Sequence, residues 1–215
     1  MESTGPVNAV LIFMNDGGIF MWIILIVWIV GLVISIERFL KFVVYDSNGP
    51  SLMNEVQKYV ISNDLGGAIK ICSNTKSFIP KIFKNGLKRA NQSVNQMQNA
   101  IDATALECIG KVESRIGYIN LLANISTLMG LLGTIYGLIQ SFEAVGAADP
   151  SKKAEILSSG ISKAMNTTAI GLISAISLMT IHAILTAKQE KIISAMDEYS
   201  IKLLDLLGTR KVEDE

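Results

Sequence analysis

Three long stretches of this 215-residue chain contain no aspartate, glutamate, lysine or arginine. They cover residues 17–36, 116–142 and 164–187, and each is at least 20 residues long. About 20 apolar residues are enough for a helix to cross the hydrocarbon core of a bilayer. A buried helix of a soluble bundle seldom lacks charge on every face. We therefore predict an all-α membrane protein with three transmembrane helices.

The chain is also poor in the groups that build enzyme and metal sites. Its two cysteines, Cys72 and Cys108, are too few for a disulfide framework, and no residue cluster has metal-ligand spacing. Gly130-x-x-Gly133 lies inside an apolar stretch with no Gly-Lys-Ser/Thr after it, so it is not a phosphate loop. Net charge is zero and no basic patch stands out, which argues against nucleic acid as a partner. We expect no enzymatic activity, no metal and no cofactor.

Basic residues near the ends of the three stretches indicate the orientation of the chain. They are Arg38, Lys41, Lys111, Arg115, Lys188 and Lys191. These six residues lie on the side of the membrane that holds the 46–115 loop and the C-terminal tail, whereas the short connection between the second and third spans has Lys152 and Lys153 beside Asp149 and Glu155. Because lysine and arginine collect on the cytoplasmic side, this side is predicted to be the cytoplasm. The N-terminus is then expected outside.

Seven segments follow from these stretches and from the helical spacing of apolar residues between them. They are an outer-surface amphipathic segment (1–16), transmembrane helix 1 (17–45), a cytoplasmic helical loop (46–115), transmembrane helix 2 (116–145), a short periplasmic connection (146–159), transmembrane helix 3 (160–187) and a cytoplasmic helical tail (188–215). Within the loop we expect helices at 52–60, at 65–73 and from Pro80. From about Ser93 the chain is expected to run as one continuous helix into the second span, and the third span to continue into the tail.

Small and hydroxyl-bearing side chains repeat along the second and third spans. Four polar residues of the second span are seven positions apart and share one helical stripe: Asn120, Thr127, Thr134 and Ser141. Small residues that allow helices to approach closely accompany them: Gly130, Gly133, Gly137, Gly160, Ala164, Gly171 and Ala175. Counting residues from the outer ends of the two spans, we expect Thr134 and Thr168 at nearly the same depth in the membrane. Spacing alone leaves two interpretations open, the lining of a wet path and simple close packing.

No carboxylate lies at membrane depth in this chain. Glu37 marks the inner end of the first span, and Glu143 marks the outer end of the second. Ion transport that is coupled to work usually requires a titratable or ion-binding group within the membrane. Two antiparallel helices also cannot enclose a water path by themselves. If the protein carries ions, we expect several copies of it and a partner chain that supplies the carboxylate.

Two motifs in these spans resemble the ExbB/TolQ/MotA family of ion-channel motor subunits. The first is the run Gly130-Leu131-Leu132-Gly133-Thr134-Ile135-Tyr136-Gly137-Leu138-Ile139, followed by Phe142. The second runs from Gly160-Ile161-Ser162 through Thr168-Ala169-Ile170-Gly171-Leu172 to Ala175-Ile176. Gly17-Gly18, Glu37-Arg38 and the segment from Asp64 to Cys72 extend the resemblance over nearly the whole chain. The number of predicted spans, three, fits the resemblance to ExbB and TolQ better than the resemblance to MotA, which has four spans.

The resemblance implies a homopentamer, a ring of five copies around a dimer of a single-span ExbD/TolR/MotB-like partner. The partner's Asp would carry the ion, and a TonB-like protein would be a third subunit in ExbB-type assemblies. The resemblance also implies a proton channel in the bacterial inner membrane that couples the ion-motive force to mechanical work. Thr134 and Thr168 match the family threonines beside that Asp. A hydroxyl there can donate to the ionised acid or accept from the protonated one.

Three positions depart from the family pattern. Thr127 and Ser177 stand where many members carry proline, which predicts a straighter third span. Lys163 stands where many ExbB members carry glutamate. With Glu143 it is expected at the outer mouth of the ring, either paired with that glutamate of a neighbouring helix or reaching lipid headgroups. Two alternatives remain open: a Na⁺-driven or gliding or flagellar stator, and a family scaffold that does not conduct.

Overall fold

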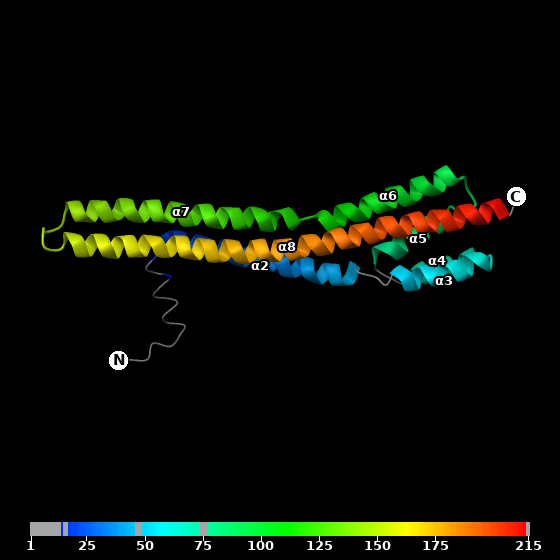
Figure 1. Cartoon of the computed structure of the whole chain (residues 1–215), viewed down its shortest axis with the longest axis horizontal. Coiled ribbons are helices and arrows are strands. Elements are labelled where there is room, and N and C mark those ends of the chain that lie inside the picture. Colours follow the sequence, from blue (N-terminus) through cyan, green and yellow to red (C-terminus); the bar gives the residue numbers. More distant parts are fainter. Residues whose placement is uncertain (1–13, 15–16, 46–48, 74–76, 214–215) are drawn as a thin grey trace, which may run out of the picture. The chain divides into compact units, whose positions relative to one another are not determined.

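Helices form the regular structure of the computed structural model, which describes residue 14 and residues 17–45, 49–73 and 77–213. These ranges contain no strand, and the predicted all-α fold is confirmed for them. The helices are α2 (Gly18–Tyr45), α3 (Gly49–Ile61), α4 (Leu65–Ser73), α5 (Phe78–Leu87), α6 (Val94–Glu113), α7 (Ile116–Gly146) and α8 (Lys153–Glu213) (Figure 1). Three helical stretches, containing α2, α7 and α8, are long and apolar enough to cross a membrane.

The helices of the loop agree closely with the expected ones. α4 has the expected bounds, and α3 extends the expected 52–60 helix by a few residues at its start. α5 begins two residues before Pro80, after Ser77 in an extended conformation. Proline is tolerated there because the first turn of a helix has no partners for its N–H groups. The expected surface segment at 1–16 lies outside the described residues, except for Met14.

The expectation of one continuous helix from Ser93 into the second span is wrong at one point. α6 starts as expected, with a capping box between Ser93 and Gln96, but it ends at Glu113. Ser114 then has ψ 137°, and Arg115 is left-handed with φ 67°. Neither conformation continues an α-helix, so α7 starts anew at Ile116. We call residues 114–115 the α6–α7 joint.

The third span belongs to a single helix of 61 residues, α8. The expected continuation of this span into the tail is confirmed, because α8 is unbroken as far as Glu213. Its start differs from expectation, since α8 begins at Lys153 and leaves only residues 147–152 as the connection to α7. The segment Ala154–Leu157 consists of good helix formers. Glu155 in the first turn also favours this start, because a helix N-terminus attracts negative charge.

The chain divides into two compact units. The first contains α2 up to Ile36, α7, and α8 up to Ile184. α7 and α8 run antiparallel, side by side, on either side of their short connection (Figure 1). Large apolar side chains are exposed on all three helices of this unit: Trp22, Ile26, Val33, Leu128, Leu131, Ile135, Ile173 and Ile176. Such surfaces suit a lipid environment, and the protein is a membrane protein.

The second unit contains α2 from Glu37, α3 to α6, and α8 from Leu185. Its core is built from one apolar face of each helix. The buried residues include Val56, Val60, Ala68, Ile82, Phe83, Leu87, Met97, Ile101, Met196 and Leu203. Cys72 and Cys108 are buried free thiols, and burial raises the pKa of Cys72 to about 11. This thiol is therefore protonated and unreactive near neutral pH.

Candidate ion-pathway site

Glycines bring α7 and α8 into backbone contact in the first unit. A Cβ placed on Gly171 would lie 2.8 Å from the carbonyl oxygen of Ser126 and 2.9 Å from the Cα of Gly130. A Cβ on Gly130 would in turn lie 3.2 Å from the Cα of Thr168. All three of these neighbouring atoms belong to the backbone, so no change of side-chain rotamer could relieve the contacts. Only glycine allows the two helices to be this close.

The small residues nearer the α7–α8 connection continue the same contact. A Cβ on Gly137 would lie 2.8 Å from the Cβ of Ala164. A Cβ on Gly160 would lie 2.6 Å from the Cβ of Ser141, whose buried hydroxyl donates to the carbonyl oxygen of Gly137. Gly133 faces the side chains of Thr167 and Phe20 instead, so it packs α7 against α8 and α2 together.

The hydroxyls of Thr134 and Thr168 meet at the centre of this contact. Their Oγ1 atoms are hydrogen-bonded to each other, and both side chains are half-buried. The carbonyl oxygen of Gly130 lies 2.9 Å from Thr168 Oγ1 and 3.2 Å from Thr134 Oγ1. The carbonyl oxygen of Ala164 lies 3.4 Å from Thr134 Oγ1. The two threonines therefore lie at one level, in agreement with the count of residues from the outer ends of the spans.

The hydroxyl protons of Thr134 and Thr168 already make hydrogen bonds within the group that these two residues form with Gly130 and Ala164. Each threonine has one O–H, and the acceptors in reach are the other hydroxyl and the carbonyls of Gly130 and Ala164. If one hydroxyl donates to the other and the second to a carbonyl, no proton remains for a third group. The lone pairs that are left can only accept. As it stands, the pair can receive a hydrogen bond from a protonated acid, and it must give up an internal bond to donate to an ionised one.

The other residues of the predicted stripe have different surroundings. Thr127 is half-buried and donates to the carbonyl oxygen of Ala123, 3.3 Å away on its own helix. Asn120 is exposed, whereas Ser141 at the opposite end of the stripe is buried. Positions seven apart drift by about 20° per step around a straight helix, so the ends of the stripe point in different directions. Whether Asn120, Thr127 and Ser141 line a path stays a prediction.

A cavity of about 580 Å³ lies on the side of the threonine pair toward the α7–α8 connection, between the first turn of α2, α7 and the start of α8. Its apolar and small lining residues include Phe20, Gly133, Gly137, Gly160 and Ala164. Its polar lining residues are Tyr136, Gln140, Ser141, Lys152, Glu155, Ser159, Lys163 and Thr167. Two of the lining residues, Gly133 and Thr167, directly precede Thr134 and Thr168 in the sequence, so the cavity extends to the threonine pair. Lys163, expected at the outer mouth, lies on its wall, while Glu143 is exposed and does not line it.

Two polar residues at the helix contacts were not singled out from the sequence. Thr167 is buried, lies against Gly133, and lines the cavity. Ser126 is fully buried, and its Oγ has no hydrogen-bond partner among the described residues. Ser126 directly precedes Thr127 of the predicted stripe, and Thr167 directly precedes Thr168. Hydroxyl residues on both sides of a stripe are the signal that could have found them.

Three helices long and apolar enough to cross a membrane, two of them joined by glycines and a hydroxyl pair, define a polytopic membrane protein. The chain matches the model of the MotA/TolQ/ExbB proton channel family over residues 74–198. This range includes the α6–α7 joint and every threonine and glycine of the site. The protein belongs to this family, as the resemblance in the two motifs predicted.

Curated relatives agree with this assignment. An ExbB homolog for biopolymer transport from Methanothermobacter thermautotrophicus is 25% identical over 84% of this chain and 64% of its own length. The biopolymer transport protein exbB1 of Vibrio cholerae is 43% identical over 29% of this chain and 28% of its own. The Tol-Pal system protein TolQ of Haemophilus influenzae is 34% identical over 32% and 29%. The chain therefore spans less than two thirds of each of these relatives.

Proposed function

We propose that this protein is the channel subunit of a motor in the bacterial inner membrane, which couples the proton-motive force to mechanical work in a partner protein. The hydrogen-bonded pair of Thr134 and Thr168 carries this proposal. It is a polar pair on the spans of a chain whose three membrane windows hold no carboxylate. Polar groups at this depth are costly in lipid and mark ion paths.

The missing carboxylate comes from the partner. We infer a homopentamer around a dimer of single-span ExbD/TolR/MotB-like chains, whose Asp passes the threonine pair of each copy. The acceptor lone pairs of the threonines favour the protonated, neutral form of that Asp. Ionisation of the Asp then requires a hydroxyl to turn away from Gly130 and donate to the acid instead. This exchange of hydrogen bonds connects the protonation of the partner to the local geometry of α7 and α8.

The cavity next to the pair provides the outer half of the path. It begins among charged and hydroxyl side chains near the connection of α7 and α8 and ends at Gly133 and Thr167. A volume of about 580 Å³ holds many water molecules. With the N-terminus in the periplasm, protons would enter from the periplasmic side through this cavity.

The test is proton flux through the protein, reconstituted together with a single-span ExbD/TolR-like partner, in vesicles with an imposed pH gradient. Thr168→Val keeps the size of the side chain and removes the hydroxyl, and we expect flux to fall tenfold or more with the ring intact. Thr168→Ser should keep most of the flux. Thr180→Val is the matched control, because Thr180 is exposed on α8 and its hydroxyl donates to the carbonyl oxygen of Ile176 on the same helix.

Full flux in Thr168→Val would remove the threonine pair from the ion path. Flux that follows a Na⁺ gradient rather than the pH gradient would show that Na⁺, and not the proton, is the coupling ion. An intact ring that passes neither ion with its partner present would leave a scaffold, and the proposed function would be wrong.

A further inference from the structure

A buried arginine connects two helices of the second unit. Arg38 lies near the inner end of the membrane window of α2, and only 2% of its surface is exposed. A guanidinium group stays charged under all physiological conditions. Taking such a charge out of water is costly unless hydrogen bonds and counter-charges compensate. The partners of Arg38 therefore determine what this residue does.

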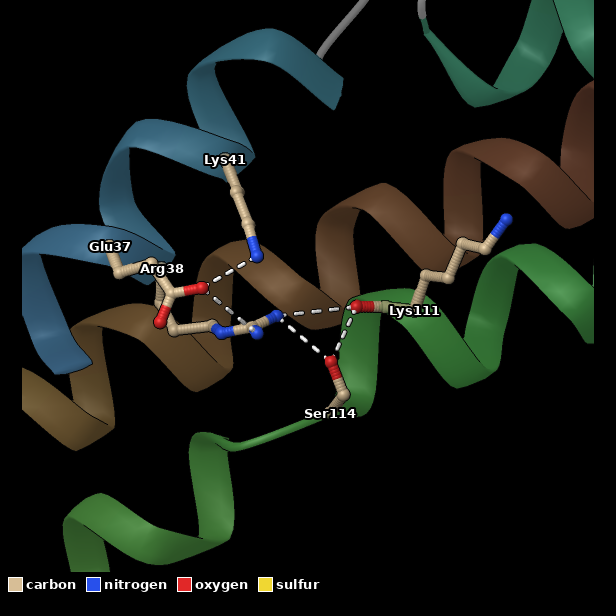
Figure 2. Close-up of polar contacts among 5 residues, drawn as sticks. All are labelled: Glu37, Arg38, Lys41, Lys111 and Ser114. Atoms are coloured by element: carbon tan, nitrogen blue, oxygen red, sulfur yellow. Dashed lines mark hydrogen bonds and ion pairs between the residues drawn. The ribbon is translucent and has the colours of Figure 1, made fainter.

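The side chain of Arg38 extends from α2 to the end of α6 (Figure 2). Its Nη1 donates to Ser114 Oγ at 3.0 Å and to the carbonyl oxygen of Lys111 at 3.4 Å. Ser114 Oγ in turn donates to the same carbonyl at 3.0 Å. The last carbonyls of a helix have no partners within the helix, and a cation there is also favoured by the helix dipole. Arg38 is thus a C-terminal cap of α6 that is supplied by another helix.

This cap lies next to the α6–α7 joint. Ser114 is its acceptor and also the first residue of the joint. Phe39, which directly follows Arg38, makes a cation–π contact with Lys188 of α8, whose Nζ lies 4.4 Å from the ring centroid. α2, α6 and α8 therefore each have a charged contact at this end of the second unit.

The guanidinium is only partly satisfied. Its Nε has no hydrogen-bond partner among the described residues. Its Nη2 approaches Glu37 Oε1 at 3.7 Å, beyond hydrogen-bond distance, while Lys41 Nζ holds the same oxygen at 2.6 Å. A buried charge with an unused donor is a local weak point, because the bonds it makes offset only part of its desolvation. The contact with α6 can open at a smaller cost than the core around it.

We propose that Arg38 is a latch that closes the last turn of α6 onto α2, and that its opening releases the α6–α7 joint as a hinge. The closed state is the one in the structure, with Nη1 on Ser114 and Lys111. In the open state the last turn of α6 loses its cap, and Ser114, the first residue of the joint, loses its hydrogen bond to Arg38. This inference goes beyond the proposed function and does not depend on ion conduction.

Amide hydrogen exchange on the full chain in lipid nanodiscs tests the latch. Arg38→Met replaces the guanidinium side chain with an unbranched apolar one and so removes every hydrogen-bond donor of this side chain. Charge-assisted hydrogen bonds lost in this way should speed exchange at residues 111–117 by about tenfold or more. Peptides from α4 and α5 should exchange as in the unchanged protein. The melting temperature should fall little, because Glu37 keeps Lys41 and no counter-charge is left alone.

Two further variants separate a latch from a general stabilising role. Lys41→Met is the matched control, because Lys41 lies one turn along the same helix and pairs with Glu37, and it should leave exchange at 111–117 unchanged. Ser114→Ala removes one acceptor from an exposed position and should give a smaller local increase, which is not additive with Arg38→Met. Equal acceleration across the whole second unit, or no acceleration at 111–117, would overturn the proposal.

Discussion

The indole Nε1 of Trp28 donates a hydrogen bond to Ser177 Oγ at 2.7 Å, and this bond connects α2 to α8 within the first unit. Ser177 Oγ also donates to the carbonyl oxygen of Ser174 at 2.8 Å, so its hydroxyl both accepts and donates. The resemblance implies proline at this position, and proline has no hydroxyl to accept a hydrogen bond. The departure from the family pattern therefore supplies the contact.

Ser177→Ala should destabilise the first unit. It removes the acceptor of Trp28 N–H in a lipid environment, where no water replaces it. Hydrogen bonds between membrane helices are worth about 0.6 kcal/mol on average and up to about 1.7, so we expect a loss near 1 kcal/mol. Reversible unfolding of the protein in micelles measures this loss.

The double variant with Trp28→Phe should show no further loss from Ser177→Ala, because the bond is already absent. Thr180→Ala on the same helix serves as the control, since its hydroxyl donates to its own helix. Additive effects of Trp28→Phe and Ser177→Ala would contradict the contact.

Gly171→Ala should separate α7 from α8. The new methyl group would lie within 3 Å of the Ser126 carbonyl oxygen and the Gly130 Cα, and neither can move without its helix. Overpacking of this kind costs roughly 1–3 kcal/mol. Gly117→Ala on α7 meets nothing within 4 Å and should be neutral or slightly stabilising. Thermal unfolding of both variants, with ring size measured by light scattering, tests this difference.

The long helices could be predicted from the sequence because their apolar windows have a length that only a bilayer requires. The level of Thr134 and Thr168 could also be predicted, since the helical rise converts residue counts into depth. These two results depend on local periodicity alone. They hold without knowledge of any tertiary contact.

The α6–α7 joint could not be predicted in this way. Residues 113–116 include no glycine or proline, and the apolar stripe of α6 continues through Val112 to Ile116, both buried. The helix ends where Arg38, 73 positions from Lys111 along the chain, caps it from another helix. Ser126 and Thr167 were missed for a related reason, because the partner helix decides which face of a span is buried.

Glu107 makes the stability of the second unit depend on pH. Hydrogen bonds from Lys111 at 2.6 Å and Lys81 at 2.8 Å, together with their charges, lower the pKa of Glu107 to about 2. A lowered pKa in the folded state means that the stabilisation is complete above the ordinary value of 4.5 and is lost as pH falls toward 2. Glu107→Gln should lower the melting temperature slightly at pH 7 and make its decline between pH 4.5 and 3 shallower.

Salt should weaken this effect, because Glu107 is exposed and its ion pairs are screened. Glu113→Gln on the same helix is the control. A decline with pH in Glu107→Gln as steep as in the unchanged protein would show that Lys81 and Lys111 do not hold this carboxylate.

Lys163→Glu should raise proton flux through the site. Lys163 lines the cavity beside the threonine pair, and a ring of copies would repeat its positive charge around the mouth, which would lower the local concentration of cations. Reversing the charge should raise flux several-fold, up to about tenfold at low ionic strength, and Lys163→Met should lie between the two. The differences should shrink as salt shortens the screening length to about 8 Å at physiological ionic strength. Lys153→Glu provides the matched control, because Lys153 does not line the cavity. Equal flux in Lys163→Glu and Lys153→Glu would show that protons do not enter through this cavity.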